Sequence, residues 1–416
     1  MSAASSARAR GGRSARGEGA AALLALPVRP TGPGALRRRL QRAEREDWDF
    51  SKGSIFGSMC SDPLPAAVQA ARRFTTANLG NPGLCPGTAR LEEEVVAMLL
   101  DLFHGPAFGA GGHVLSGGTE ANITALWMAR NATEGKEVVL PESAHFSFVK
   151  ALDLLGLTPR WVPLDELGRA RPEEVRRAVG PRTAAVVAVA GTTELGAVDP
   201  VPEIARIAEE ARVPLHVDAA FGGFVLPFLE GKGALPAFDL QVPGVTSLAV
   251  DPHKMGRAPV PAGVLLTRHR EASSSISVAS PYLSSPEASG LLGTRASSAV
   301  AATYAALTSL GVQGYRRQVA RVLDLTRRLV EGGRALGLRP VVPPTMNLVV
   351  FHHENPVAVQ TWMLERGWDV SSIRAPSGLR FVVMPHATPL TVSKLLGDLR
   401  SALARFPPGG GGSSAR

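Results

Sequence analysis

A chain of 416 residues, 45% hydrophobic and 19% charged, can bury a large core and is expected to divide into two or three units. Its formal net charge of +9 is concentrated at one end, because residues 1–40 hold eight arginines and one acid (+7) and leave +2 for the rest. A nearly neutral body argues against a basic groove, so no nucleic-acid partner is expected.

Membrane insertion and a disulfide framework are also not expected. No apolar run reaches the roughly 18 residues that a membrane helix needs. The two cysteines, Cys60 and Cys85, are too few for a disulfide scaffold and lack the spacing of metal ligands. A reducing cytoplasm, no membrane contact and no metal site are the expectations.

The first 34 residues are rich in Ser, Ala, Gly, Arg and Pro, a composition that favours a disordered extension. An organelle transit peptide or an over-long start is the alternative. Residues 35–55 form an N-terminal segment in which the Arg/Glu-rich stretch 35–47 predicts a helix. A nucleic-acid or membrane-surface binder acting through residues 1–40 is the non-enzyme alternative, and it predicts salt-sensitive binding that is lost on deletion of that segment.

Turn residues and glycines mark two possible walls of a site. Stretches 53–60 and 78–84 are rich in Gly, Asn and Pro and form either a pocket wall or surface loops. After a predicted helix at 91–103, Ser116-Gly117-Gly118-Thr119 lies at the start of another helix. Backbone N–H groups, two hydroxyls and a helix dipole there would suit a phosphate group, although a Thr cap after glycines is common in any fold.

Strands and helices then alternate. This pattern predicts a mostly parallel sheet with right-handed crossovers, in which His145, Thr192, Asp218 and Lys254 all follow strand ends and can meet in one crevice. The predicted strands are 137–140, 161–164, 184–190, 214–217, 245–250 and 263–267, and the predicted helices between them end near 155, 179 and 211.

Lys254 stands out by its residue type. The chain has only six lysines against 39 arginines, and only a lysine amine can lose its proton and attack a carbonyl to form a Schiff base. A surface lysine with a solvated amine is the plain alternative.

The second half contains a Ser-rich stretch, 273–289, which holds Tyr282 and suits either a mobile lid or a surface loop. Helices are expected after Arg295 and over 312–336. Strands 347–351 and 379–384 with helices 356–367 and 389–406 form a smaller α/β unit. The predicted boundaries are 56–308 for a large domain, 309–405 for a small domain and 406–416 for a flexible tail.

A phosphate cradle, a histidine, a strand-end Asp and a strand-end Lys are together the set that a pyridoxal phosphate site needs. Each has a plainer alternative, since Asp218 could cap a helix or bind a metal and His145 could be a core histidine. Their order and spacing favour the cofactor site.

The sequence resembles the group II pyridoxal-phosphate-dependent amino-acid decarboxylases, and within them the archaeal tyrosine/aspartate decarboxylases, over about residues 48–405. The resemblance implies pyridoxal-phosphate fold type I (aspartate aminotransferase-like), with a mostly parallel seven-stranded sheet and a small C-terminal α/β domain. The matching motifs are GSMCS (57–61), NLGNPGL (78–84), SGGTEAN (116–122), AHFSF (144–148), AGTTELG (190–196), HVDAAFGG (216–223), DPHKMG (251–256), PYL (281–283), LGTR (292–295) and VVMPH (382–386).

The resemblance also implies residue roles. Lys254 would bind the cofactor covalently, Asp218 would contact the pyridine nitrogen and His145 would stack on the ring. Tyr282 would donate a proton to the substrate α-carbon, and Arg380 would take the α-carboxylate. The remaining cofactor-binding assignments are Ser116, Gly117, Gly118, Thr119, Thr192, Ala220 and His253, and Asn81 joins Arg380 in the substrate-binding set.

One position departs from the animal members of this family, which usually carry Asn where this chain has Asp251. An acid that faced a phosphate would be repelled, so Asp251 is expected to point elsewhere. The archaeal members share this Asp.

The expected reaction is decarboxylation of L-aspartate to β-alanine, a coenzyme A precursor. Alternatives are tyrosine to tyramine, a step toward methanofuran, or glutamate decarboxylation. A more distant one is a pyridoxal-phosphate carbon–carbon lyase such as sphingosine-phosphate lyase. A desulfurase would need a cysteine on a mobile loop, and both cysteines lie early in the chain. A homodimer is expected by resemblance.

Overall fold

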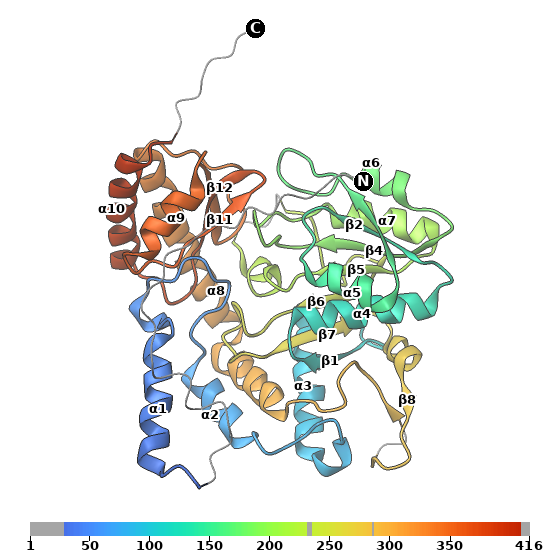
Figure 1. Ribbon diagram of the computed structural model, residues 1–416. Coiled ribbons are helices and arrows are strands. Elements are labelled where there is room, and N and C mark those ends of the chain that lie inside the picture. Colours follow the sequence, from blue (N-terminus) through green and yellow to red (C-terminus); the bar gives the residue numbers. More distant parts are fainter. Residues whose placement is uncertain (1–28, 231–234, 285–286, 409–416) are drawn as a thin grey trace, which may run out of the picture. The chain divides into compact units, whose positions relative to one another are not determined.

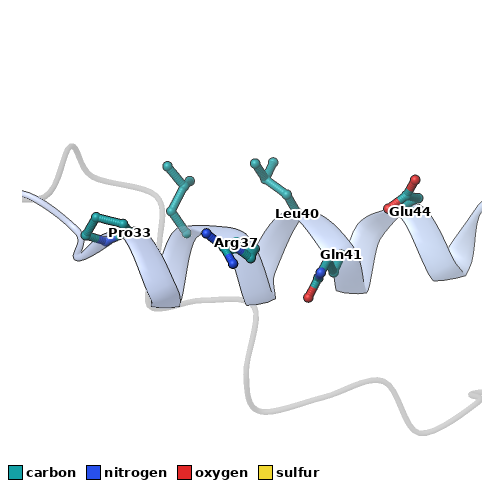
Figure 2. Close-up of a pocket in the computed structure, with 6 residues that line it drawn as sticks. Pro33, Arg37, Leu40, Gln41 and Glu44 are labelled. Atoms are coloured by element: carbon teal, nitrogen blue, oxygen red, sulfur yellow. The ribbon is translucent and has the colours of Figure 1, made fainter.

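The computed structural model describes residues 29–230, 235–284 and 287–408, so most of the predicted extension at 1–34 and tail at 406–416 lie outside the described residues. Residues 1–49 and 50–416 form two compact units. In the first, helix α1 (Pro33–Glu46) confirms the predicted helix and buries none of its side chains. Figure 2 shows Leu40 projecting from this helix, on a shallow face that Leu36 shares.

The core of the second unit is a seven-stranded sheet in the order β1-β7-β6-β5-β4-β2-β3 (Figure 1). Strand β7 runs in the direction opposite to the other six strands, which confirms the mostly parallel sheet. The strands are β1 (Gly111–Leu115), β2 (Glu137–Pro141), β3 (Thr158–Val162), β4 (Thr183–Val189), β5 (Leu215–Asp218), β6 (Val245–Val250) and β7 (Gly263–Thr267).

Helices cover both faces of this sheet. Alternate side chains of a strand point to opposite faces, and in strand β4 both sets of side chains are largely apolar and packed against helices. In β4, Val186 and Ala188 pack into the largest hydrophobic cluster, which includes residues of α3 (Pro86–Leu102) and α7 (Val201–Ala211). Ala185 and Val187 instead join side chains of α4 (Gly118–Ala132) and α5 (Ser147–Leu155). All seven residues of β4 are therefore buried, as in a parallel strand at the centre of a three-layer fold.

The strand directions decide where the site can form. β1 and β6 are both antiparallel to β7, whereas β6, β5, β4 and β2 are parallel to one another. The carboxyl ends of β1, β2, β4, β5 and β6 consequently lie along one edge of the sheet, which is where open α/β sheets bind ligands.

The long helix α8 (Ser297–Ala335) contains a non-helical residue, Gly311, at φ 55°. This kink separates the two helices that the sequence predicted. Beyond it lies a three-stranded antiparallel sheet in the order β10-β12-β11. Its strands are β10 (Leu348–His352), β11 (Ser371–Arg374) and β12 (Ser377–Val382), flanked by α9 (Pro356–Leu364) and α10 (Pro389–Arg405).

Several short elements were not predicted from the sequence. These are α2 (Pro65–Arg73), β11 and the two-residue strands β8 (Val278–Ala279) and β9 (Glu287–Ala288), which lie in the Ser-rich stretch. Helix α6 (Pro172–Ala178) agrees with the predicted helix at 172–179. Among the described residues, no helix combines the length and apolarity needed to span a bilayer.

Candidate active site

A cavity of about 280 Å³ lies at the carboxyl edge of the large sheet. Five strand ends contribute to it, and Lys254, Asp218 and His145 all line it. The lining consists of Ser116, Gly117, Gly118, Thr119, Asn122, Ser143, His145, Val189, Gly191, Thr193, Asp218, Ala220, Phe221, Asp251, His253 and Lys254.

The loop between β1 and α4 is packed too closely for larger residues. A Cβ on Gly117 would lie 3.2 Å from Cε1 of His253, and one on Gly118 would lie 3.0 Å from Cβ of Ala220 and 3.1 Å from Oδ2 of Asp251. Two glycines thus let the backbone and the amino-terminal end of α4 border the cavity directly. Free N–H groups and the positive end of a helix are suited to a phosphate.

Lys254 projects into this cavity beside two carboxylates. Its amine Nζ lies 3.0 Å from Oδ2 of Asp251, whose side chain is 3% exposed. Burial alone would lower the pKa of Lys254, but the negative charges of Asp251 and Asp218 outweigh it and the pKa is raised. Asp251 was expected to point away from a phosphate, and its carboxylate faces the Lys254 amine as a counter-ion.

His145 follows β2 and has a fixed ring orientation. The backbone N–H of Ser147 donates to Nδ1 of His145 at 3.2 Å, so Nδ1 is an acceptor and a neutral ring carries its proton on Nε2. Burial lowers the pKa of this histidine, and Asp218 opposes that effect only in part. A neutral, partly buried imidazole is suited to lie flat against another ring.

Asp218 ends β5 and is 5% exposed. Its Oδ1 accepts the backbone N–H of Ala220 at 3.0 Å, and its Oδ2 accepts the side-chain amide of Asn122 at 2.9 Å. These donors hold the carboxylate at one border of the cavity. His253, at the other side, donates from Nδ1 to the carbonyl of Ala262, which directs its Nε2 toward Asp251 at 3.7 Å.

Two predicted residues lie just behind the cavity lining. The Thr192 side chain is buried, and its Oγ1 accepts the backbone N–H of Ala197 at 2.9 Å, so it braces the turn after β4. The Arg380 guanidinium donates to the carbonyl oxygens of Thr193 (2.7 Å) and Gly57 (2.9 Å). Burial lowers the pKa of Arg380 to about 10, although Glu194 and Asp369 oppose the shift. Their predicted roles stay predictions.

Tyr282 lines a second, larger cavity, and Asn81 lies between two residues that also line it, Gly80 and Pro82. Tyr282 is 84% exposed and lines a groove of about 1130 Å³ together with Gly80 and Pro82. Asn81 accepts the backbone N–H of Ser284 at 3.2 Å, which ties loop 78–84 to the Ser-rich stretch. The structure therefore brings these two residues to neighbouring segments, outside the cavity that contains Lys254.

Comparison with known proteins decides the family. Residues 50–353 match the model of the pyridoxal-dependent decarboxylase conserved domain. The chain belongs to this family. The match covers more than half of the sequence and includes every residue that lines the Lys254 cavity.

Similar proteins from other organisms agree with the assignment to the decarboxylase family. A protein of Methanothrix thermoacetophila named "Probable L-tyrosine/L-aspartate decarboxylase" is 44% identical over 88% of this chain and 95% of its own length. A protein of Archaeoglobus fulgidus named "Probable L-aspartate decarboxylase" is 42% identical over 88% of this chain and 98% of its own length.

Two solved structures extend the comparison. Sphingosine-1-phosphate lyase of Burkholderia pseudomallei has a TM-score of 0.85 and 30% identity, covering 92% of this chain and 93% of that one. Lactobacillus brevis glutamate decarboxylase has a TM-score of 0.82 and 19% identity, covering 93% of this chain and 95% of that one. At this identity the comparison shows a shared fold only. The protein is an amino-acid carboxy-lyase that uses pyridoxal phosphate.

The residues of the decarboxylase cavity fit this cofactor. The glycine loop leaves room that a Cβ would fill, and Oγ of Ser143 is a buried polar atom without a hydrogen-bond partner in the cavity wall. Lys254 has an amine that could react with the aldehyde, and the glycine loop could offer N–H groups to the phosphate. Across the described residues, no cluster of three His, Cys, Asp or Glu side chains could hold a metal ion.

Sequence reasoning missed several lining residues of the decarboxylase. Asn122 belongs to the SGGTEAN motif and follows Gly118 by one helical turn, so it lies on the helix face that meets the cavity. That spacing was the available signal. Ser143, Thr193 and Phe221 adjoin the predicted residues in sequence but carry no signal of their own.

Proposed function

We propose that this decarboxylase acts on L-aspartate and releases β-alanine and CO2. The observation that carries the proposal is that L-aspartate occurs in the names of both archaeal relatives, of which one also names L-tyrosine. β-Alanine is a coenzyme A precursor, so the proposed role is to supply that pathway.

Lys254, Asp218 and His145 are proposed to hold the cofactor and set its reactivity. Pyridoxal phosphate, when bound, supplies an electron-accepting ring that takes up the electron pair left when the bond between the α-carbon and the carboxylate breaks. Lys254 attaches the cofactor through its amine, which must first lose a proton against the pull of Asp251. Asp218 would favour a protonated ring nitrogen, and His145, whose pKa is lowered by burial, would contact the ring as a neutral imidazole.

The phosphate would be held by Ser116, Gly117, Gly118, Thr119 and His253. This set combines backbone N–H groups at the start of α4 with two hydroxyls and one imidazole. Ala220 lies next to Asp218 and would pack against the opposite face of the ring. Thr192 would contribute indirectly, because it braces the turn that presents Gly191 and Thr193 to the cavity.

Substrate recognition is proposed to involve Arg380. Its Nε and Nη1 groups already donate to backbone carbonyls beside the cavity, and only Nη2 has no hydrogen bond among the described residues. That nitrogen is the candidate partner of the α-carboxylate. After CO2 leaves, the α-carbon takes up a proton, for which Tyr282 is the proposed donor, and Asn81 anchors the adjoining segment through Ser284.

The cavity lining does not by itself distinguish an acidic from an aromatic substrate. Its described wall contains no arginine, whereas Phe221 and Val189 give it an apolar portion that would suit tyrosine. Phe224 and Phe228, which follow Phe221 closely in sequence, pack against Tyr315 in the core. Tyrosine and glutamate are therefore the alternative substrates.

A direct test uses the purified full-length chain loaded with pyridoxal phosphate. It is incubated separately with L-aspartate, L-tyrosine and L-glutamate, and CO2 and the corresponding amine are measured. The proposal requires the highest kcat/KM with L-aspartate. A preference for tyrosine or glutamate would overturn the substrate while leaving the decarboxylase assignment intact.

A carbon–carbon lyase is the second candidate, because the solved structure at 30% identity is a sphingosine-1-phosphate lyase. Such a reaction breaks the bond between the amine-bearing carbon and the next carbon of the chain, and its substrate needs no α-carboxylate. Incubation with sphingosine 1-phosphate and an assay for the aldehyde product tests it. Aldehyde formation without CO2 release from any amino acid would favour the lyase.

Oligomeric state and location complete the proposal. By family resemblance we propose a homodimer, which light scattering of the purified chain would test. A reducing compartment such as the cytoplasm is supported by Cys60 and Cys85, both of which are free thiols.

A further inference from the structure

A row of buried polar side chains extends from Asp218 into the core between α4 and the sheet. Asn122, 1% exposed, donates from Nδ2 to Oδ2 of Asp218 at 2.9 Å. Its Oδ1 lies 2.9 Å from Nε2 of His216, and Nδ1 of His216 lies 2.8 Å from Oγ of Ser247. The residues come from α4, β5 and β6, so the fold brings three elements together to form this row.

The chemistry of Asp218 fixes the direction of every hydrogen bond in the row. A carboxylate oxygen only accepts, so the amide nitrogen of Asn122 must face it and Oδ1 must face His216. His216 therefore carries its proton on Nε2 and accepts from the Ser247 hydroxyl through Nδ1. Burial lowers the pKa of His216 to about 4, so the imidazole is neutral and only this tautomer satisfies both neighbours.

The row leaves Asn122 no freedom to turn. Its second amide hydrogen is taken by Oγ of Ser147 at 3.0 Å, so both donors and the acceptor are used. Asp218 in turn has one oxygen held by Asn122 and the other by the N–H of Ala220 at 3.0 Å. A buried polar group with all its partners in place is held rigidly, because any rotation leaves an unpaired atom.

We propose that Asn122 and His216 are positioning residues, which orient the Asp218 carboxylate toward the ring nitrogen of the cofactor. The inference rests on the proposed role of Asp218. Neither residue needs to touch the substrate, since Asn122 acts through Asp218 and His216 acts through Asn122. The alternative is that these side chains merely fill the core and satisfy one another.

The test compares variants of the full-length chain that preserve volume but change hydrogen bonding. Asn122→Leu removes both donors, and Asn122→Asp places a second acid against Asp218. His216→Leu removes the donor to Asn122, whereas His216→Gln keeps an amide N–H in its place. Thr326→Val is the matched control, because it deletes a hydroxyl that is also buried but lies in helix α8, where it bonds only to the carbonyl of Val322.

The readouts are the dissociation constant for pyridoxal phosphate, the thermal midpoint, and kcat and KM at saturating cofactor. Loss of the contact to a charged group is expected to weaken cofactor binding about 10- to 100-fold in both Asn122 variants. At saturating cofactor, kcat falls while KM for the amino acid changes less than about twofold. His216→Leu behaves similarly, His216→Gln regains most of the loss, and Thr326→Val matches the wild type in cofactor affinity.

Two results would overturn the inference. One is a folded Asn122→Leu or Asn122→Asp protein with wild-type cofactor affinity and kcat. The other is equal behaviour of His216→Gln and His216→Leu, which decides the matter if the Asn122 variants do not fold. Asp218→Ala distinguishes failure of this inference from failure of the proposed role of Asp218. If Asp218→Ala retains cofactor affinity and kcat, the proposed role of Asp218 is wrong. If Asp218→Ala loses them while the Asn122 and His216 variants do not, only the positioning role is wrong.

Discussion

The amine of Lys254 and the carboxylate of Asp251 lie 3.0 Å apart, and both line the cavity at the carboxyl end of β6. Only two residues lie between them in sequence, and Asp251 is the first residue after the strand. The carboxylate favours the charged ammonium, whereas attachment of the cofactor needs the neutral amine. With Lys254 in its proposed role, this ion pair requires the release of a proton before the cofactor can be attached.

Replacement of Asp251 by Asn should speed the attachment of pyridoxal phosphate at neutral pH. Loss of the nearest negative charge lowers the pKa of Lys254 and raises the fraction of neutral amine, so the pH of half-maximal loading rate shifts downward. Asp218, Cys60, His145 and His253 also face this amine and stay unchanged. The measurement is the rate of cofactor loading, followed by absorbance over a pH series.

Asp324→Asn is the control for that experiment, because Asp324 pairs with Arg327 and Arg328 on the surface of α8. It should load at the wild-type rate at every pH. An Asp251→Asn protein whose loading rate is unchanged or shifts to higher pH would show that Asp251 does not retain the proton of Lys254.

Lys254→Ala should abolish covalent attachment of the cofactor and turnover together, since no other lysine lines the cavity wall described here. The bound cofactor's near-visible absorbance band and CO2 release are the two measurements. Lys394→Ala, at an exposed position of α10, is the matched control and should keep both. A Lys254→Ala protein that kept both the absorbance band and CO2 release would show that this lysine does not attach the cofactor.

Arg380→Lys keeps a positive charge but loses the planar fork that reaches Thr193 and Gly57. If Nη2 of the guanidinium binds the substrate α-carboxylate, KM for the amino acid should rise about tenfold or more, because a single ammonium cannot hold both carbonyls and reach the carboxylate as well. Arg321→Lys is the control, since Arg321 also donates to a backbone carbonyl, that of Ala387, from outside the cavity lining. A lower thermal midpoint of Arg380→Lys with unchanged KM would show that Arg380 stabilises the fold and does not bind the substrate.

Tyr282→Phe removes one hydroxyl from a side chain that is 84% exposed beside the larger groove. If this hydroxyl returns the proton to the α-carbon, kcat should fall about 100-fold or more while KM stays close to that of the wild type. Steady-state kinetics on the cofactor-loaded enzyme measures both constants, with Tyr304→Phe on α8 as the control. Equal kcat in the two variants would remove Tyr282 from the mechanism.

The alternation of strands and helices could be predicted because the central strands are buried on both faces and read as continuous apolar runs, as in β4. Strand β11 could not, since Ser371–Arg374 is short, largely polar and pairs with one strand only. Helix α2 buries Ala67 alone, so its sequence lacks a wide apolar stripe.

Within the site, the residues directly after strands could be placed from topology alone, which is why Asp218 and Lys254 were expected to meet. The partner of Asp251 was not predicted, because its position in the sequence suggested only repulsion from a phosphate, whereas the folded chain places the Lys254 amine 3.0 Å from its carboxylate. The spacing from Gly118 could place Asn122 beside the cavity, but its proposed positioning role depends on contacts with Asp218 and His216 that form only in the folded chain.

The neutral histidine of the buried row should make the fold sensitive to acid. Burial lowers the pKa of His216 from 6.5 to about 4, so between these values the unfolded chain binds a proton that the native protein excludes. The stability present above pH 6.5 is therefore lost as the pH falls toward 4, by about 3 kcal/mol in the free energy of unfolding. His216→Gln cannot titrate, so urea unfolding over a pH series should show a shallower acid loss than in the wild type. His352→Gln, at an exposed histidine of β10, is the control, and equal acid slopes in the wild type and His216→Gln would contradict the prediction.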